Sequence, residues 1–500
     1  MCLNSTLFKL FTFIFYIDVY FYRKLTLNKR YCYYFNEICK IPHGSRNEKA
    51  LSDYIVNFAK EHHLDYKQDD VYNVIIEKPA SKGYEKSEPI ILQAHIDMVN
   101  EKNKTSNHDF EKDPLDLYVD EDGWLHARGT TLGADDGKGV AYMLAILEDN
   151  TLEHPFLQCY FTTMEEIGLI GAVNLKKEDI KANKLINLDG GGEFVTTTSS
   201  SGGANVFVTK EVSFVPNEDP TYQLEIRGLL GGHSGTLIHT EKGNANTIAT
   251  RILKEAEIHD CNITLVSFNG GLKDNAIPRE ADVVFTSTTP FDELEKVIQS
   301  SSEGIYKELE FSDFGFKANL VKIETASKKF AQDDSECCLN YAYLAPNGFQ
   351  HKSMAIEGLT QSSTNLGVIT TSEHSVLFDH LIRSCIDAST FDLLYKMETL
   401  AKLFGMTVEK NTNIKAWSFE ANSPMRELYR KILKDRNLEL EEKAVHGGLE
   451  TGVFKGLNPK MDIITMGAIS EGAHTPDEKL DLASFDRTYT ILCDFLKESK

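Results

Sequence analysis

Histidine and acidic residues recur at the ends of short apolar runs in the first part of the chain. His95 and Asp97 end one apolar run, Glu165 and Glu166 follow a second, and Asp189 follows a third. Imidazole nitrogens and carboxylate oxygens are the side-chain atoms that bind zinc and similar divalent ions. The residue types therefore predict a metal site, provided that the fold brings them together.

In two pairs of nearby residues, the two members can have different chemical roles. Glu165 and Glu166 are adjacent carboxylates, so one can bind a metal while the other stays free to accept a proton. Asp97 lies two residues after His95 and can accept the second N–H of the imidazole, which fixes its tautomer and raises its basicity. We expect one base, one ligand and one orienting carboxylate among these residues.

A glycine-rich turn carries Asp135 and Asp136 into a predicted helix at 137–149. The positive N-terminal end of a helix favours ionised carboxylates. Singly, each of these patterns is common and usually structural. Their joint occurrence within 95–189, each at the end of a predicted strand or turn, makes a chance arrangement the minor reading.

The elements that must position these side chains form an α/β pattern. Apolar runs at 89–95, 156–163 and 184–188 precede the polar residues, and helical spacing of apolar residues predicts helices at 47–62 and 137–149. Strands that alternate with helices imply a mostly parallel sheet, whose strands end at a common edge where ligands bind.

The pattern changes after the third apolar run. Residues 194–411 read as a separate α+β unit, and the α/β pattern returns over 412–500. We expect an α/β fold with a mostly parallel-sheet catalytic domain, made of 33–193 and 412–500, that is interrupted by an inserted α+β lid domain.

The first 32 residues do not match the rest of the chain. Residues 7–22 are apolar and aromatic, but they are fewer than the ~20 residues of a membrane-spanning helix and include Lys9 and Asp18. No basic region precedes them and no small-residue cleavage site follows them. We expect 1–32 to be an atypical extension outside the fold, with a membrane anchor as the alternative.

The net charge and the cysteine content indicate which partners and which cellular compartment suit this protein. Lys+Arg number 53 and Asp+Glu 75, a formal net charge of −22, which argues against nucleic acid because phosphate binding needs a basic face. The nine cysteines are odd in number and scattered, which favours reduced thiols and a cytoplasmic protein.

The chain resembles the aminoacyl-histidine dipeptidases, also called cytosol non-specific dipeptidases, of the di-zinc M20 peptidases. The resemblance covers 33–500, and the segments that carry it, in order, are LQAHIDMV, RGTTLGADDGKGVA, TMEEIGLIGA, NLDGG, GLLGGHSG, NAIPRE, RSCIDAS, HGGLETG and GAHTPDE. It implies hydrolysis of dipeptides, Xaa-His among them, with two divalent ions. Zinc is the expected metal, and manganese and cobalt are alternatives.

The resemblance also assigns metal ligands. It implies that Asp135 bridges the two ions, that one site is completed by His95 and Asp189, and that the other is completed by Glu166 and His474. Asp136 departs from the family, which tends to have Asn there. The choice of Asp135 over Asp136 as the bridge therefore rests on the family analogy.

Catalytic and substrate-binding roles follow from the same resemblance. Glu165 would be the general base, Asp97 would orient His95, and His233 of the inserted domain would polarise the scissile carbonyl. Asn275 and Arg383 would bind the free carboxylate of the substrate, because a planar guanidinium suits a carboxylate. A fixed distance from Arg383 to the metals would favour dipeptides.

His446 and Glu450 lie at a predicted strand-to-helix turn. They either shape the substrate pocket or mark only the entry to a helix. Family members often pair as homodimers, although the sequence itself carries no interface signal. The alternative functions are another M20-type amidohydrolase, either a tripeptidase or an N-acyl amino acid deacylase, and a metal-binding scaffold without catalysis.

Overall fold

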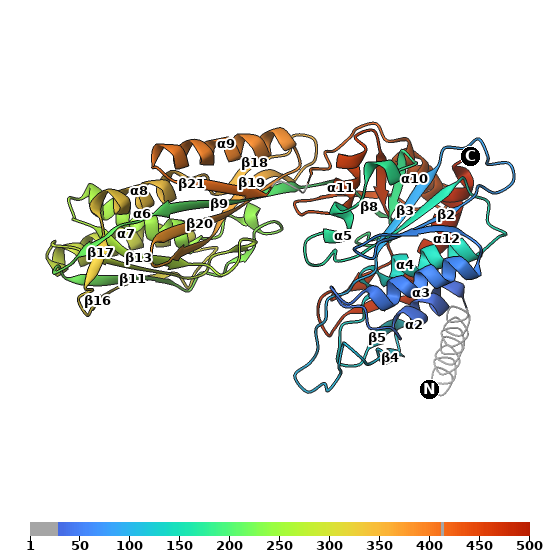
Figure 1. The fold of residues 1–500 in the computed structure, drawn as a ribbon, viewed down its shortest axis with the longest axis horizontal. Helices are drawn as coiled ribbons and strands as arrows, with labels where there is room; N and C mark the ends of the chain where they lie inside the picture. The colour runs from blue at the N-terminus through green and yellow to red at the C-terminus, as the bar shows by residue number, and fades with distance from the viewer. Residues whose placement is uncertain (1–28, 412–414) are drawn as a thin grey trace, which may run out of the picture. The chain divides into compact units, whose positions relative to one another are not determined.

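The computed structural model describes residues 29–411 and 415–500, which form two compact units (Figure 1). Unit 1 contains the described residues up to 198 together with 420–443 and 449–500. Unit 2 contains 199–419 and 444–448.

The core of unit 1 is a six-stranded sheet in the order β1-β2-β6-β3-β7-β23. Its strands are β1 (Asp65–Gln68), β2 (Val74–Lys78), β3 (Ile90–His95), β6 (Leu157–Thr162), β7 (Lys184–Asn187) and β23 (Asp462–Thr465). β3 runs parallel to β6 and β7, and β23 runs parallel to β7, whereas β1 and β2 pair antiparallel. The expected mostly parallel sheet is present.

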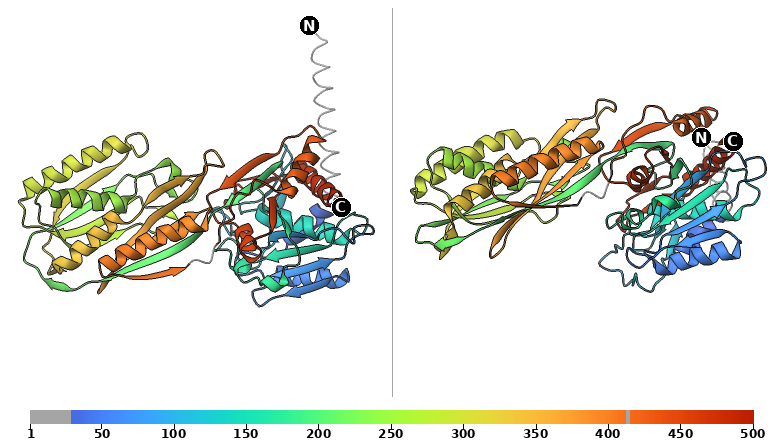
Figure 2. Two further views of the ribbon diagram at one scale, coloured as in Figure 1. Left: turned by 90° about the horizontal axis from the view of Figure 1, so that it is seen from above. Right: turned by 45° about the horizontal axis from the view of Figure 1, so that its top comes forward.

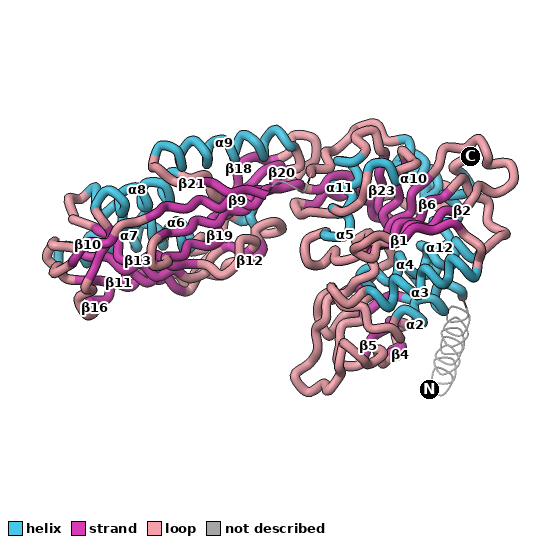
Figure 3. The backbone as a smooth tube through the Cα atoms, in the orientation of Figure 1, coloured by secondary structure: helices cyan, strands magenta, loops and turns pink. Residues whose placement is uncertain are grey.

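Both faces of this sheet are covered, so β3 and β6 are buried at every position, as is typical of parallel sheets. The helices of unit 1 are α2 (Arg30–Ile38), α3 (Lys49–Glu61), α4 (Ala134–Glu148), α5 (Ile170–Val173), η1 (Lys177–Asp179), α10 (Pro424–Lys434), α11 (Glu450–Leu457) and α12 (Leu482–Glu498). Helices α2, α3 and α4 gather on one side of the strands (Figure 3). Phe454 of α11 packs edge-on against Tyr160 of β6.

The chain joins the packed unit earlier than we expected. α2 begins at Arg30, and its Tyr31 is 2% exposed and packs edge-on against Phe485 of α12. The aromatic composition of this helix resembles that of the preceding residues, which hid its start in the sequence. Residues 1–28, including the apolar run at 7–22, lie outside the described residues. Within the described part of the chain, no helix has the length and apolarity needed to cross a membrane.

A small antiparallel sheet, ordered β24-β25-β5-β4, accompanies the main sheet. Its strands are β4 (Leu117–Val119), β5 (Trp124–Ala127), β24 (Ser470–Glu471) and β25 (Lys479–Asp481). The loop between β24 and β25 carries His474, so this sheet fixes the two ends of the segment that holds the histidine.

Unit 2 is built on a nine-stranded sheet with the path β16-β11-β15-β13-β19-β20-β9-β21, to which β18 adds beside β19. Its strands are β9 (Gly202–Glu211), β11 (Thr221–Arg227), β13 (Thr264–Gly270), β15 (Ala281–Thr286), β16 (Lys317–Ile323), β18 (Gly348–Lys352), β19 (Thr360–Thr371), β20 (Ser375–Ser384) and β21 (Thr407–Asn411). The pairings of this sheet are antiparallel.

Four helices cover one face of this sheet, as two further views show (Figure 2). They are α6 (Ala245–Ile258), α7 (Phe291–Leu309), α8 (Gln332–Leu344) and α9 (Asp387–Leu403), with a short η2 (Ile238–Thr240). Burial alternates along β20, because one face packs on the helices and the other is more exposed. Short pairs complete the architecture: β10 (Phe214–Pro216) with β17 (Lys328–Phe330), β12 (Gly232–His233) with β14 (Ala276–Ile277), and β8 (Val195–Ser200) with β22 (Glu441–Val445).

Candidate metal and catalytic site

Parallel pairing brings the predicted ligands of unit 1 to one edge of the main sheet. His95 is the last residue of β3 and pairs in register with Thr162, the last residue of β6. Glu165 and Glu166 follow β6 closely, and Asp189 lies two residues after the end of β7. Because these strands point the same way, their carboxyl ends share an edge.

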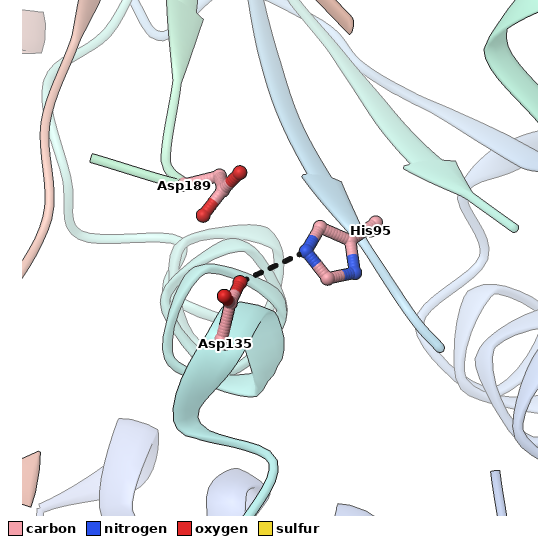
Figure 4. Close-up of side chains that lie close together, drawn as sticks. All are labelled: His95, Asp135 and Asp189. Atoms are coloured by element: carbon pink, nitrogen blue, oxygen red, sulfur yellow. Dashed lines mark hydrogen bonds and ion pairs between the residues drawn. The ribbon is translucent and has the colours of Figure 1, made fainter. Parts of the chain in front are cut away.

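Asp135 lies between two imidazoles. Its Oδ1 atom is 3.1 Å from Nε2 of His95, and its Oδ2 atom is 3.5 Å from Nε2 of His474. His474 also lies 2.8 Å from Oε1 of Glu166. Figure 4 shows His95, Asp135 and Asp189 converging from β3, α4 and the end of β7. Asp135 thus offers a separate oxygen atom to each histidine.

Three overlapping groups of these side chains can each hold a metal ion. They are His95 with Asp135 and Asp189, His95 with Glu165 and Glu166, and Asp135 with Glu166 and His474. Within each group the ligand atoms lie within 4.8 Å of one another. Two imidazoles surrounded by carboxylates fit zinc, manganese or cobalt, and no cysteine joins the groups found among the described residues.

The turn that carries Asp135 is held by a glutamate that the sequence analysis missed. Glu478 is 2% exposed. Its Oε2 accepts hydrogen bonds from the backbone N–H groups of Leu132 and Gly133 at 2.7 and 2.9 Å, and its Oε1 accepts one from Asp135 at 3.2 Å. Gly133 has a φ of 69°, a left-handed conformation that glycine adopts without strain. Glu478 is the last residue of the segment GAHTPDE, which the sequence analysis singled out. The sequence does not show that Glu478 contacts the turn at 132–135.

The Asp97 carboxylate contacts the segment that follows β6 as well as His95. Its carboxylate accepts hydrogen bonds from the backbone N–H groups of Glu165 at 2.9 Å and Glu166 at 3.3 Å, and from the Ser45 hydroxyl at 2.8 Å. Nδ1 of His95 lies 3.0 Å from the backbone carbonyl of Asp97 and 3.6 Å from its carboxylate. One buried carboxylate therefore fixes the segment that carries the adjacent glutamates.

The cluster concentrates negative charge in a buried place. Burial disfavours charge on Asp135, yet hydrogen bonds with His474 and His95 hold the pKa of its carboxyl well below the usual range. Hydrogen bonds to Asp135 and Glu166 raise the pKa of His474 to about 10. Burial raises the pKa of Glu165 to about 8, against the opposing influence of His95.

A buried polar network lies behind the strand ends. Oε2 of Glu450, at the start of α11, accepts hydrogen bonds from Gln93 of β3 and from Thr162 of β6, the latter at 2.9 Å. Gln93 in turn accepts a hydrogen bond from Asn187 of β7 at 2.7 Å. Glu450 is 3% exposed. Its contacts are therefore with the strands that carry the ligands.

His233 and Asn275 are neighbours in unit 2. His233 pairs with Ala276 across β12 and β14, and the backbone N–H of Ser234 donates to the carbonyl of Asn275 at 2.9 Å. Nδ1 of His233 accepts hydrogen bonds from the N–H groups of Gly235 and Thr236, each at 3.2 Å. The proton of the neutral ring is then on Nε2, which is free to donate. Burial and the nearby Arg383 lower the pKa of His233, which favours this neutral form.

Arg383 lines a cavity of about 200 Å³ in unit 2, together with Asp274, Asn275, Asn205 and Asn411. Its Nε is buried and has no hydrogen-bond partner among the described residues. A buried guanidinium with an unused N–H is suited to a carboxylate from outside the chain.

His446 has both ring nitrogens engaged within unit 2. Nδ1 lies 2.9 Å from the Ser201 hydroxyl and Nε2 lies 2.7 Å from the Ser363 hydroxyl. Burial, with a smaller contribution from Arg383, lowers the pKa of His446 to about 3, so the ring is neutral. Ser363 is the register partner of Arg383 across β19 and β20. His446 therefore supports the strand pair that carries the arginine.

Comparisons with known proteins agree with the geometry. The model of peptidase family M20/M25/M40 matches residues 91–498. A cytosol non-specific dipeptidase from Escherichia coli K12 is 36% identical over 474 residues, covering 93% of this chain and 96% of the relative. The crystal structure of an aminoacylhistidine dipeptidase from Vibrio alginolyticus superposes with a TM-score of 0.86 at 34% identity, covering 95% of this chain and 98% of that one.

The aminopeptidase PepT from Bacillus cereus shares the fold, with a TM-score of 0.54 at 16% identity over 94% of this chain and 98% of that chain. The family resemblance read from the sequence segments is thereby confirmed, as is the combination of a parallel catalytic sheet with a separate antiparallel one. The chain belongs to peptidase family M20.

Proposed function

We propose that this protein is a metal-dependent dipeptidase that acts in the cytoplasm. Support comes from its similarity, over more than nine-tenths of the chain, to a cytosol non-specific dipeptidase and to an aminoacylhistidine dipeptidase. The observation that carries the proposal is the position of Asp135, which contributes to two of the candidate metal groups.

In this proposal Asp135 would be shared by two divalent ions. His95 and Asp189 would complete one site, and Glu166 and His474 would complete the other. Asp135, and not Asp136, belongs to the ligand groups found among the described residues, which supports it as the bridge. When bound, the two ions supply Lewis acidity and lower the pKa of a water molecule toward neutrality. Zinc is the proposed metal, with manganese or cobalt as alternatives.

Glu165 is the proposed general base. Hydrogen bonds from the backbone N–H groups of Glu165 and Glu166 to Asp97 fix the backbone of this segment. Since His95 and Glu166 are the proposed ligands of separate ions, the Glu165 carboxylate is the one assigned to take a proton from the attacking water. The same carboxyl then gives the proton to the leaving amine as the peptide bond breaks. No covalent intermediate with the protein is required.

The proposed roles in unit 2 concern substrate. Nε2–H of His233 donates to the carbonyl oxygen of the scissile bond as negative charge develops there. Arg383 and Asn275, which line the same cavity, bind the free carboxylate of the peptide. His446 and Glu450 are buried, so we propose that they hold the substrate-binding and metal-binding strands in place.

We propose that unit 1 is the catalytic domain and that unit 2 is the inserted substrate-binding domain. Pairing into a homodimer, which the resemblance implies, is tested by light scattering of the purified chain.

The decisive experiment replaces the base while keeping its size and polarity. Glu165→Gln should retain bound metal but lose about 10²- to 10⁴-fold in kcat on dipeptides. Unchanged turnover would refute the assignment of the base. Turnover should also disappear after chelation and return with added zinc, manganese or cobalt. Assays on tripeptides and N-acyl amino acids separate the alternatives, since strong cleavage of either would show a different substrate class.

A further inference from the structure

A buried ion pair lies on the segment that directly follows Asp135, the proposed bridging residue. Asp136 is 0% exposed and Lys138 is 2% exposed. Nζ of Lys138 lies 3.7 Å from Oδ1 of Asp136. Fully buried lysines are rare, because removing an ammonium from water is costly unless a negative charge compensates it. Asp136 is the residue at which the sequence departs from the expected Asn.

The surroundings of Lys138 contain four carboxylates. Asp136 and Asp135 attract it most strongly, followed by Asp189 and Glu478. Two of these four, Asp135 and Asp189, are proposed metal ligands. The ammonium can therefore form its ion pair either with Asp136 or with the carboxylates that are proposed to bind metal.

Lys138 also holds the peptide group that leads into the bridge. Its ammonium donates to the backbone carbonyl of Ala134 at 3.3 Å, and Glu478 accepts from the N–H of Asp135 at 3.2 Å. The carbonyl of Ala134 and the N–H of Asp135 belong to one peptide bond. Both polar ends of the peptide that precedes the bridging side chain are thus fixed by buried charged groups.

The site for the Asp136 carboxylate is closely fitted. Its Oδ1 accepts a hydrogen bond from the N–H of Gly139 at 3.3 Å, and its Oδ2 is buried without a hydrogen-bond partner among the described residues. A Cβ atom at Gly139 would lie 2.7 Å from Oδ2 and 2.7 Å from Cβ of Leu188, which precedes Asp189. Because residue 139 is glycine, there is room for the Asp136 carboxylate next to Leu188.

We propose that Asp136 and Lys138 form a positioning pair, in which Asp136 holds the buried ammonium so that Asp135 and Asp189 remain available to the metal ions. The inference rests on the proposed metal site. Neither residue belongs to the candidate metal groups found among the described residues, so their effect on metal binding would pass through Asp135 and Asp189.

The test compares Asp136→Asn with the double variant Asp136→Asn/Lys138→Met. Metal is removed with a chelator, and Co²⁺ affinity is then measured by chelator competition, with the visible absorption spectrum of bound Co²⁺ as a report on its ligands. In Asp136→Asn the ammonium loses its own carboxylate and competes with Co²⁺ for Asp135 and Asp189. The Co²⁺ affinity should therefore fall about tenfold or more. In the double variant the ammonium is gone, and the affinity should recover to within about threefold of the unmodified protein.

Two further variants serve as controls. Lys138→Met alone leaves an extra buried carboxylate and removes one hydrogen bond to the Ala134 carbonyl, so it should lower the melting temperature of the metal-free protein and weaken Co²⁺ binding by no more than about threefold. Lys78→Met removes another buried lysine, whose Nζ donates to the carbonyls of Ile146 and Asp149 at the opposite end of α4. It should lower the melting temperature and leave the Co²⁺ affinity unchanged.

The outcomes separate the inference from the proposed function. If the unmodified protein binds no Co²⁺, the proposed metal site fails. If it binds Co²⁺ and Asp136→Asn binds equally well, the positioning pair is wrong. If both Asp136→Asn and the double variant bind equally weakly, Asp136 is itself a ligand or only a structural group, and the positioning pair is again wrong.

Discussion

The carboxylate of Asp97 accepts a hydrogen bond from the backbone N–H of Glu165 at a distance of 2.9 Å. Asp97 follows β3 and Glu165 follows β6, so this bond ties together the ends of two adjacent parallel strands. The same carboxylate lies 3.6 Å from Nδ1 of His95. A single aspartate therefore relates the position of the proposed base to that of a proposed metal ligand.

Asp97→Asn is expected to disturb both the proposed base, Glu165, and the proposed metal ligand His95. The N–H groups of Glu165 and Glu166 donate to different oxygen atoms of Asp97. An Asn side chain replaces one of these oxygens with a donor NH₂, so one of the two bonds is lost. Loss of a partner that supports a metal ligand typically costs about 10- to 100-fold in metal affinity or activity, and we expect kcat to fall within that range.

The matched control for Asp97→Asn is Ser45→Ala. It removes the hydroxyl that donates to Oδ2 of Asp97 at 2.8 Å and leaves the two backbone donors in place. Its effect on kcat should be under about tenfold, since one neutral donor is lost. Equal losses in the two variants would contradict the role given to the Asp97 carboxylate.

Arg383→Met is expected to raise KM for dipeptides more than it lowers kcat. A charge-assisted hydrogen bond contributes about 1.5–3 kcal/mol, which corresponds to a loss of roughly 10- to 150-fold in kcat/KM. Dipeptide amides, which lack the free carboxylate, should lose little. If the variant loses equally on acids and amides, Arg383 does not bind the substrate carboxylate.

Glu450→Ala is expected to destabilise unit 1, because the side chains of Gln93 and Thr162 would lose their buried acceptor. Gln93 could still donate to the Thr162 hydroxyl and Thr162 to the Ala94 carbonyl, but the loss of two buried hydrogen bonds to a carboxylate costs about 2–5 kcal/mol of unfolding free energy. Glu450→Gln retains an acceptor oxygen and should cost less than about 1.5 kcal/mol. Thermal unfolding of the metal-free proteins measures the difference, and a Gln variant as unstable as the Ala variant would argue against this network.

His380 is expected to make unit 2 less stable as the pH falls. It is 0% exposed and lies 3.1 Å from the Tyr341 hydroxyl, and burial lowers the pKa of His380 from 6.5 to about 3. Between these values the unfolded chain binds a proton that the folded chain does not, so the stability present above pH 6.5 is lost toward pH 3. The slope is about 1 kcal/mol per pH unit.

Urea unfolding at several pH values between 4 and 7 measures this slope. His380→Gln should show a flatter pH dependence than the unmodified protein by about 1 kcal/mol per pH unit. Tyr341→Phe keeps the buried imidazole, so it should lose stability while retaining the slope. Parallel curves for His380→Gln and the unmodified protein would contradict the pKa shift.

Much of the site could be predicted from the sequence because it depends on strand direction. Once β3, β6 and β7 are parallel neighbours, residues that follow their ends must lie at one edge of the sheet, and His95, Glu166 and Asp189 follow from that rule. His474 is different. It lies in a loop far along the chain, and the family resemblance, not the local pattern, identified it.

The supporting groups could not be predicted, because their partners are distant in sequence. Glu478 caps a turn at Leu132 that precedes it by 346 residues, and Glu450 meets Gln93 across 357 residues. No local spacing signals such a contact. Lys138 looked like an ordinary helix residue until the structure placed its ammonium among carboxylates. The start of α2 was missed because Tyr31 continues an aromatic run whose packing only the fold determines.

The most direct test of the central claim is anomalous diffraction from crystals of the zinc-loaded protein. We expect two peaks of zinc density roughly 3.5–4 Å apart, with one oxygen of Asp135 bound to each ion. A single peak, or two ions joined through Asp136 and not through Asp135, would contradict the account.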